Sequence, residues 1–429
     1  MTNAQSAARA KPTPRVVKLE GLRSHFPALD RRHNGHPVAY FDGPGGTQVP
    51  REVAEAMSDY LLHHNANTHW DYPTSQETDA MIGESRRAVA DFLNATPDEI
   101  VFGANMTTLT FHLARALARE WKSGDEVVIT ELDHHANVAP WRALEQEKGI
   151  VVRTARMDPK SGTLDLDDVM KQFTARTKLL AVGAASNALG TITQVHTLGQ
   201  RAHALGAEVF VDAVHFAPHQ LVDVRILDCD YLACSAYKFY GPHIGILYGK
   251  KDRLEAIDFP RLEPAPQQAP ERAETGTQNH EGIIGAGAAV NFLASFTENP
   301  ANRRAALSGF FSVMHMQGAA QVKQLWTGLS AIDGVTLFGP VPETHPRTPT
   351  LAFTLRGMST TDVARQLAGK GLFVSNGDFY AMTVLERIGQ SADGVVRVGC
   401  SCYTTSEEID RLLHEVKELS RKLPAAKKS

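Results

Sequence analysis

The sequence predicts an α/β protein, because short apolar segments with β-strand character alternate with amphipathic helical segments along most of the chain. The stretch 207–213 (AEVFVDA) is a β-rich run, whereas the stretch 51–64 carries apolar residues at helical spacing. A chain of 429 residues can bury one large core and a second, smaller one. We therefore expect two packed units, each built from strands and helices.

The composition gives no reason to propose a nucleic-acid or membrane partner. The formal net charge is −4, and no apolar run reaches the ~20 residues that a membrane-spanning helix requires. Four cysteines in a chain of this length do not form a disulfide framework. The N-terminal residues lack the apolar core of a secretory signal, and although a transit peptide is also basic and free of acids, we expect a flexible arm over residues 1–16. We expect the protein to be cytoplasmic.

Periodicity and turn residues place the elements in order. The predicted helices are 17–29, 51–64, 77–93, 198–205, 282–296, 310–329, 360–368 and 407–423. The predicted strands are 39–42, 99–103, 127–131, 150–153, 177–182, 209–211, 231–234, 244–248, 335–338, 350–355, 372–374 and 395–398.

A strand turns into a helix around Asn105 to Thr108. The first N–H groups of a helix are free and lie at the positive end of its dipole, which suits a phosphate group. We place a phosphate on the Met106 and Thr107 amides and on the Thr107 hydroxyl. The alternative is an ordinary threonine at the start of a helix, without a ligand.

Lys238 lies inside an otherwise uncharged run, between the strand-like segments 231–234 and 244–248. Lysine is rarely buried without a partner, so this position requires either a salt bridge or a Schiff base, which removes the ammonium charge. Asp212 ends the preceding strand, where a carboxylate can pair with the cationic ring nitrogen of pyridoxal phosphate (PLP). An aspartate and a lysine at this spacing are consistent with PLP enzymes of fold type I.

Seven segments of the chain resemble, in the same order, those of the class V aminotransferase family, and in particular the group II cysteine desulfurases and selenocysteine lyases. They are YFDGPGGTQVP (40–50), DEVVITELDHHANVAPW (125–141), SNALGTI (186–192), VDAVHFAPH (211–219), CSAYKFYGPHIGILYG (234–249), ETGTQN (274–279) and RVGCSCYTTSEEID (397–410). The resemblance implies PLP as the cofactor and the PLP-dependent transferase fold of type I. It predicts a large domain over 39–296 with a mainly parallel, seven-stranded type of sheet, a small α/β C-terminal domain over 297–429, and a segment over 17–38 that joins the small domain.

The resemblance also assigns roles to single residues. It places His134 against the PLP ring and Arg397 on the α-carboxylate of a small amino-acid substrate, a role that suits the arginine fork. It places Asn187 near the phenolic oxygen of PLP or the substrate carboxylate, although a plain turn before Gly190 is the alternative, and His215 near the same oxygen. A metal site at His134 and His135 is a weaker hypothesis, because no other ligand is spaced to complete it.

The remaining assignments concern the phosphate. Ser235 and Tyr237 are expected to contact it or its surroundings. Thr277 is expected to bind the phosphate of the partner chain, so the resemblance implies a homodimer in which each site is completed by the other chain.

The resemblance fails at one point that matters for the reaction. Desulfurases use a cysteine on a mobile loop, and that loop aligns with VSNGDFYAM (374–382), where Tyr380 stands in place of the cysteine. Cys400 and Cys402 follow Arg397 closely, but a Cys-x-Cys pair there is expected to be structural. Desulfurases also usually have histidine at the position of Tyr237 and glutamine at the position of His215. Unlike glutamine, His215 can titrate.

We therefore expect a PLP-dependent lyase that eliminates sulfur or selenium from a cysteine-like substrate, with Lys238 as the base and Tyr380 closing the pocket or acting as the acid. Alternatives are an amino-acid racemase or epimerase, an aminotransferase, a cysteine desulfurase, and a non-catalytic PLP-binding scaffold.

Overall fold

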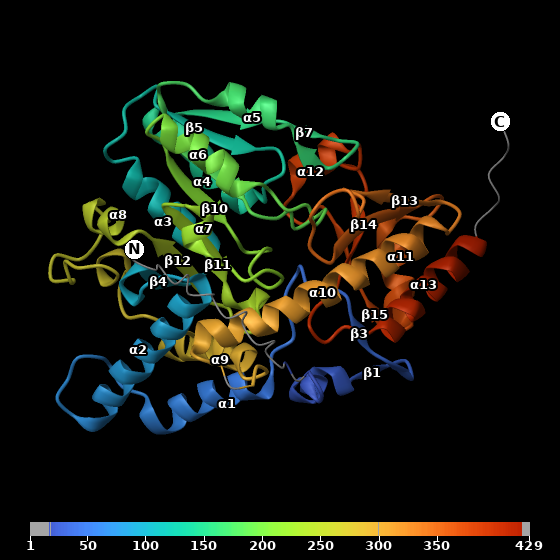
Figure 1. Ribbon diagram of the computed structural model, residues 1–429, viewed down its shortest axis with the longest axis horizontal. Helices are drawn as coiled ribbons and strands as arrows, with labels where there is room; N and C mark the ends of the chain where they lie inside the picture. Colours follow the sequence, from blue (N-terminus) through green and yellow to red (C-terminus); the bar gives the residue numbers. More distant parts are fainter. Residues whose placement is uncertain (1–16, 18, 299, 423–429) are drawn as a thin grey trace, which may run out of the picture.

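The computed structural model describes residues 17, 19–298 and 300–422. Two β-sheets organise this part of the chain, a seven-stranded one in the left half of Figure 1 and a four-stranded one in the right half. The predicted arm over residues 1–16 lies outside the described residues. The predicted division of the chain at residues 38 and 296 stays a prediction.

The large sheet is mainly parallel, as predicted. Its strands lie in the order β4 (Ile100–Gly103), β12 (Gly245–Gly249), β11 (Tyr231–Ser235), β10 (Glu208–Asp212), β9 (Thr177–Gly183), β5 (Glu126–Thr130) and β6 (Val151–Ala155). The pairs from β11 to β6 are parallel, whereas β12 runs antiparallel to both β11 and β4. The carboxyl ends of β9, β10 and β11 therefore meet at one edge of the sheet.

Both faces of the large sheet are buried, because successive side chains of a strand point to opposite faces. Val127 and Ile129 pack with α3 (Met106–Leu117) and α4 (Ala139–Lys148) in one apolar cluster. Val128, between them, packs in the other cluster, which contains residues of α2 (Pro73–Leu93), α6 (Val195–Ala204) and α9 (His280–Ala294). The sheet therefore lies between two layers of helices (Figure 1).

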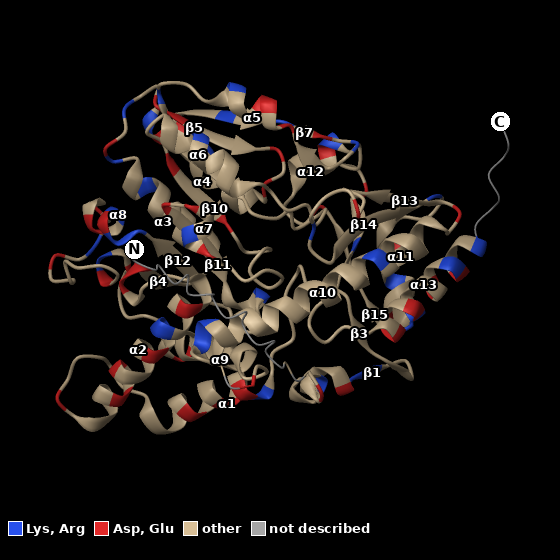
Figure 2. Cartoon of the chain, viewed as in Figure 1, with Lys and Arg blue, Asp and Glu red and all other residues tan. Residues whose placement is uncertain are grey.

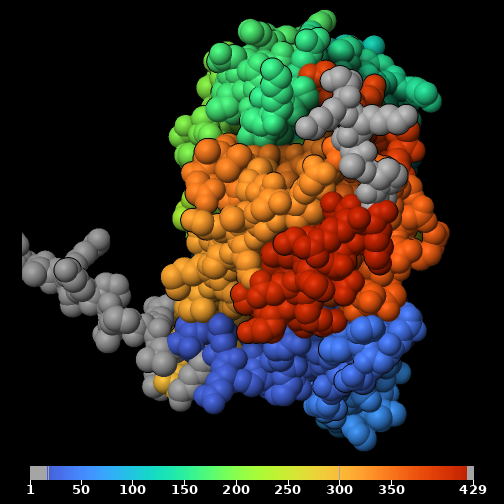
Figure 3. Space-filling model, turned by 90° about the vertical axis from the view of Figure 1, so that its right-hand side faces the viewer, coloured from blue at the N-terminus to red at the C-terminus, as the bar shows by residue number. Residues whose placement is uncertain are grey.

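The smaller sheet is antiparallel and has the order β13 (Val335–Phe338), β14 (Thr350–Leu355), β17 (Val395–Gly399) and β16 (Ser375–Gly377). It shares an apolar cluster with α10 (Arg303–Ser330), α11 (Thr360–Gly369) and α13 (Ser406–Arg421). Beside it, β3 (Ala39–Tyr40) pairs with β15 (Leu372–Phe373), which ties the N-terminal segment to this unit. In Figure 3 the red C-terminal segment lies between the orange segment that contains α10 and the blue N-terminal segment.

The other elements are short or peripheral. The helical ones are η1 (Leu22–His25), η2 (Pro27–Asp30), α1 (Arg51–Asp59), η3 (Tyr60–His64), η4 (Pro97–Glu99), η5 (His135–Asn137), α5 (Leu166–Gln172), α7 (Val224–Leu227), η6 (Ala236–Lys238), α8 (Lys251–Ala256), η7 (Glu271–Ala273) and α12 (Met382–Arg387). The strands are β1 (Arg32–His33), β2 (His36–Pro37), β7 (Met157–Asp158) and β8 (Thr163–Leu164).

One prediction of helix extent is wrong. The segment 17–29 is not one helix, since Gly21 adopts φ 79° and Pro27 begins a new turn, so only η1 and η2 form. α9 and α10 are two separate helices. Pro300 separates them, and the Asn302 side chain accepts a hydrogen bond from the Ala305 N–H to start α10 afresh.

Charged side chains of both signs are interspersed over the two units in the view of Figure 2. None of the helices in the described part of the chain has the length and apolar character needed to cross a bilayer.

Candidate active site

A cavity of about 700 Å³ lies where the carboxyl ends of the central strands face the small sheet. It brings together every predicted site residue except Thr277. The lining includes Met106, Thr107, His134, Asn187, Asp212, His215, Ser235, Tyr237, Lys238, Tyr380 and Arg397. Because these residues come from seven separate segments of the chain, their convergence is a property of the fold and not of any single motif.

Lys238 is buried at the turn after β11, and its Nζ donates to two carbonyl oxygens of the loop after β3, those of Pro44 and Gly45, the latter at 3.0 Å. Burial, reinforced by the positive charge of Arg397, lowers the pKa of Lys238 to about 7. The carboxylates of Asp42 and Asp212 oppose this shift. A lysine with this pKa is partly neutral at physiological pH, and only the neutral amine is a nucleophile or a base.

Asp212 ends β10, and its Oδ1 accepts a hydrogen bond from the Val214 N–H at 2.9 Å. Burial raises the pKa of the Asp212 carboxyl to about 6, so it stays ionised at neutral pH. The geometry provides a buried anion with no cation in direct contact among its described neighbours, which suits a positively charged ring nitrogen.

His134 follows β5 and lies at the start of η5. Its Nδ1 accepts a hydrogen bond from the Ala136 N–H at 3.0 Å, so the proton of the neutral ring is on Nε2. Burial and the charges of Lys238 and Arg397 lower the pKa of His134 to about 4. A neutral, flat ring at this place can lie against an aromatic cofactor.

The start of α3 faces the cavity, and the Asn105 side chain caps it by accepting from the Thr108 N–H at 2.9 Å. The Met106 N–H is not free, because it donates to Ser235 Oγ at 3.2 Å. The predicted contact of the Met106 amide with a phosphate therefore stays a prediction, and it would replace this hydrogen bond. A phosphate there would meet Ser235 and Thr107 first.

Gly245 explains how the start of α3 can approach the sheet. A Cβ at this position would lie 2.4 Å from the carbonyl carbon of Asn105, which is too close for any side chain. The glycine of β12 therefore fixes the position of the candidate phosphate site relative to Lys238.

Arg397, on β17, is the best-connected side chain of the site. Its Nε donates to Ser375 Oγ at 3.2 Å, its Nη1 to the Asn187 carbonyl at 3.2 Å, and its Nη2 to Asp42 Oδ1 at 3.1 Å. The Phe379 ring lies 4.0 Å from the guanidinium carbon. These contacts hold the planar guanidinium group of Arg397 in a fixed orientation, as recognition of a carboxylate requires.

Asn187 and His215 each have an atom with no partner. The Asn187 Nδ2 donates to the Phe379 carbonyl at 2.9 Å, and the His215 Nε2 is shared by the hydroxyls of Thr348 and Thr350. The Asn187 Oδ1 and the His215 Nδ1 are buried, and neither has a hydrogen-bond partner among the described residues. Burial lowers the pKa of His215 well below its usual range.

Tyr380 lies beside His134, with ring centroids 5.6 Å apart, and 69 % of its surface is exposed. Its carbonyl accepts a hydrogen bond from the His135 N–H at 2.7 Å. Both Phe379 and Tyr380 adopt positive φ, 56° and 57°, which non-glycine residues rarely do. The loop is therefore held in one conformation by its contacts with Asn187 and His135.

Sequence reasoning missed two residues. Asp42 ends the predicted strand 39–42, but nothing in the sequence indicated its ion pair with Arg397. Phe379 precedes Tyr380 in the aligned loop, and its contact with Arg397 was equally unforeseen. An aromatic residue next to a singled-out loop position was the only available signal.

Thr277 lies outside this cavity. It is exposed and lines a second cavity of about 1190 Å³, together with Trp70, Leu262 and Arg86. Its hydroxyl therefore does not reach the Lys238 site of its own chain, and the role predicted for it requires a second chain.

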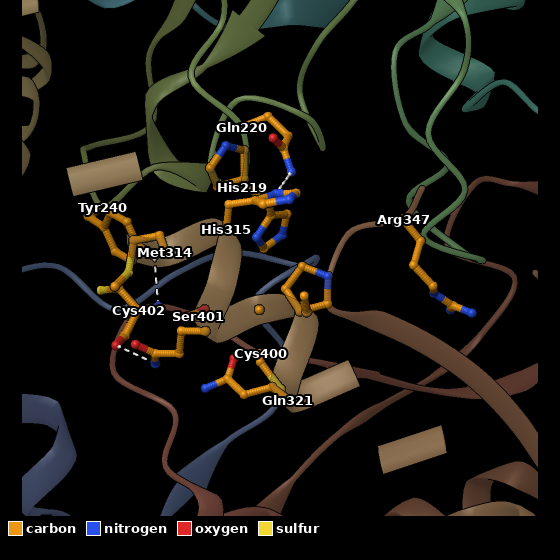
Figure 4. A pocket seen from close by; sticks show the side chains of 15 residues that line it. His219, Gln220, Tyr240, Met314, His315, Gln321, Arg347, Cys400, Ser401 and Cys402 are labelled. Atoms are coloured by element: carbon orange, nitrogen blue, oxygen red, sulfur yellow. Dashed lines mark hydrogen bonds between the residues drawn. The ribbon is translucent and has the colours of Figure 1, made fainter. Parts of the chain in front are cut away.

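All four cysteines of the chain are buried and free. Cys400 and Cys402 line a small separate cavity with His219 and Ser401, beneath α10, and none of the four lines the Lys238 cavity (Figure 4). Burial raises the pKa of the Cys400 thiol far above its usual range, and that of Cys402 to about 12. Such thiols are inert as nucleophiles at neutral pH.

The cavity fits PLP. A buried carboxylate, a neutral flat ring, a lysine of low pKa and the start of a helix lie around one space, where two further polar atoms lack partners. Among the described residues, no group of three or more His, Cys, Asp and Glu side chains could hold a metal ion. The fold and the site together define a PLP-dependent enzyme of fold type I.

Comparisons with known proteins agree. Residues 39–412 match the aminotransferase class-V family. A cysteine desulfurase of Pectobacterium carotovorum is 33 % identical over 422 residues, which is 94 % of this chain and 98 % of that protein. A cysteine desulfurase of Synechococcus elongatus is also 33 % identical, and the match covers 94 % of this chain but only 63 % of that longer protein. The apo structure of a cysteine desulfurase from Thermococcus onnurineus superposes with a TM-score of 0.84 at 30 % identity, covering 97 % of this chain and all of the other.

The chain belongs to the aminotransferase class-V family, whose cofactor is PLP. Within that family it is cysteine desulfurase-like.

Proposed function

We propose that the protein is a β-eliminating lyase that breaks the C–S or C–Se bond of a small, cysteine-like amino acid. The observation that carries the proposal is the combination of a cavity that fits PLP with a loop that has no cysteine. Lys238, Asp212 and Arg397 converge on one cavity, whereas Tyr380 occupies the loop position of the desulfurase nucleophile and every thiol of the chain is buried. A reaction that needs no protein thiol is therefore favoured over desulfuration.

The Asp212 carboxylate would pair with the ring nitrogen of PLP, and the His134 ring would lie against the face of the PLP ring. Asn187 and His215 would lie near the phenolic oxygen of PLP. Thr107, Ser235 and Tyr237 would hold the phosphate, with the Thr277 hydroxyl from a partner chain completing it. We propose a homodimer on this basis. When bound, PLP supplies an electron sink that makes the substrate Cα–H acidic.

The residues of the chain would divide the remaining work. Arg397 would hold the α-carboxylate through the N–H groups that its present partners leave free. The Nζ of Lys238 would take the Cα proton, since its low pKa leaves it partly neutral. The sulfur leaves with the electron pair of the C–S bond, and the Tyr380 hydroxyl would give it a proton. The released aminoacrylate hydrolyses to pyruvate and ammonia.

Product analysis tests the proposal. The PLP-loaded protein is incubated with L-cysteine, cystine, S-alkylcysteines and selenocysteine, and pyruvate, alanine, and sulfide or thiol are quantified. Pyruvate together with sulfide or thiol is the expected result. Alanine would instead establish desulfuration or deselenation and overturn the elimination.

A third outcome separates the remaining alternatives. If no product forms but an amino acid changes the visible absorbance of bound PLP, exchange of the Cα hydrogen with deuterium oxide would indicate racemase or epimerase chemistry. Formation of a keto acid with loss of the PLP absorbance would indicate transamination. Absence of both would leave a PLP-binding scaffold.

We also propose a cytoplasmic location. Four free, buried thiols are typical of proteins from a reducing compartment, where disulfides rarely form. Alkylation of the unfolded protein directly after cell lysis would show four reduced thiols, and any disulfide would contradict this proposal.

A further inference from the structure

The guanidinium of Arg397 is covered on one side by an aromatic ring. Three of its five N–H groups have partners, those to Ser375, Asn187 and Asp42, so two remain among the described residues. The Phe379 ring lies 4.0 Å from the guanidinium carbon, well within the range of a cation–π contact. Only 4 % of the Arg397 side chain is exposed, so the ring acts on a cation that is largely removed from water.

The position of the Phe379 ring beside Arg397 is fixed by the backbone of its loop. It adopts φ 56°, and the following residue adopts φ 57°, a backbone conformation that needs external support. Two hydrogen bonds provide this support. The Asn187 side-chain amide donates to the Phe379 carbonyl at 2.9 Å, and the His135 N–H donates to the Tyr380 carbonyl at 2.7 Å. The backbone carbonyl of the same Asn187 accepts a hydrogen bond from Arg397, so one residue positions both the arginine and the loop that carries the ring.

We infer that Phe379 is a specificity-determining residue, which covers one face of Arg397 and so directs the α-carboxylate of the substrate to the remaining edge of the guanidinium. This inference rests on the proposed role of Arg397 as the carboxylate anchor. The ring excludes water from one face of the Arg397 guanidinium and keeps this planar group in one orientation, and both effects strengthen a bidentate carboxylate contact. The ring should not strengthen the binding of an amine that has no carboxylate.

Two small amines separate this role from general support of the cofactor site. Glycine carries an amine and a carboxylate without a side chain, and methylamine carries the amine alone. The dissociation constant of each is measured for the PLP-loaded protein from the change in visible absorbance. Phe379→Leu should weaken glycine binding about tenfold, because water would then compete with the carboxylate for the uncovered guanidinium, and leave methylamine binding unchanged.

Three further variants make the test decisive. Phe379→Tyr keeps an aromatic face and should bind glycine within about twofold of the natural protein. Phe338→Leu is the matched control, because Phe338 packs against the same apolar cluster as Phe379 but is not in contact with Arg397. Phe379→Met serves as a second non-aromatic variant if the leucine variant does not fold.

The inference fails if glycine and methylamine weaken equally, if neither weakens, or if Phe338→Leu has the same effect as Phe379→Leu. Its failure is distinct from that of the proposed elimination. A protein that forms no pyruvate but shows the expected dependence of glycine binding on Phe379 would refute the reaction and retain the inference.

Discussion

The low pKa of Lys238 predicts how the cofactor-free protein takes up PLP. An ordinary lysine has a pKa of about 10.4, so only about one amine in 2,500 is neutral at pH 7. With the pKa of Lys238 at about 7, half of the protein carries the neutral amine at that pH. The rate of PLP attachment should therefore rise with pH, reach half of its plateau near pH 7, and level off above pH 8 instead of rising beyond pH 9.

Stopped-flow absorbance at several pH values gives this profile, with N-acetyl-lysine as the control for the titration of PLP itself. Substitution of the neighbouring charged residues checks the direction of the pKa shift of Lys238. The Arg397 charge lowers the pKa of Lys238, so Arg397→Gln should move the midpoint to higher pH. The Asp42 charge raises that pKa, so Asp42→Asn should move the midpoint to lower pH. A midpoint above pH 9, or shifts of both variants in the same direction, would refute the reasoning.

Three other predictions concern the acid, the phosphate site and the thiols. Tyr380→Phe should slow turnover while the visible absorbance of bound PLP stays intact, and unchanged turnover would end its role as the acid. Gly245→Ala should lower the free energy of unfolding by about 1–3 kcal/mol, because its Cβ would overlap Asn105, whereas Gly369→Ala, with open space around it, should be nearly neutral in thermal denaturation. Cys402→Ala should leave product formation within about twofold, since the thiol is buried outside the site, and loss of product with a normal melting temperature would contradict this.

The sequence predicted the convergence of Lys238 and Asp212 because it placed each at the end of a strand, and parallel strands end at a common edge. Arg397 followed from the resemblance. The contacts around Arg397 could not be predicted in this way. Asp42 is 355 positions away from Arg397 in the sequence, and Phe379 reaches Arg397 only because its backbone adopts a conformation that the sequence gives no reason to expect.

Hydrogen-bond partners were equally hard to foresee. The Met106 amide was assigned to a ligand, but Ser235 is close enough to accept from it, because β11 and the start of α3 approach each other through Gly245. Which of two nearby acceptors takes a donor depends on distances of less than 1 Å. Strand and helix periodicity do not determine distances on that scale.

The position of β12 has a consequence for how the chain acquires its cofactor. β4 and β11 are connected in the sheet only through β12, which lies between them and is synthesised about 140 residues after β4. Until β12 pairs, β4 has no neighbouring strand in the sheet, and the start of α3 has no fixed position relative to Lys238. Pairings over such long sequence separations form slowly. Assembly of the cofactor site on the ribosome is therefore delayed until this late strand has emerged, and the growing chain exposes an aggregation-prone edge during that interval.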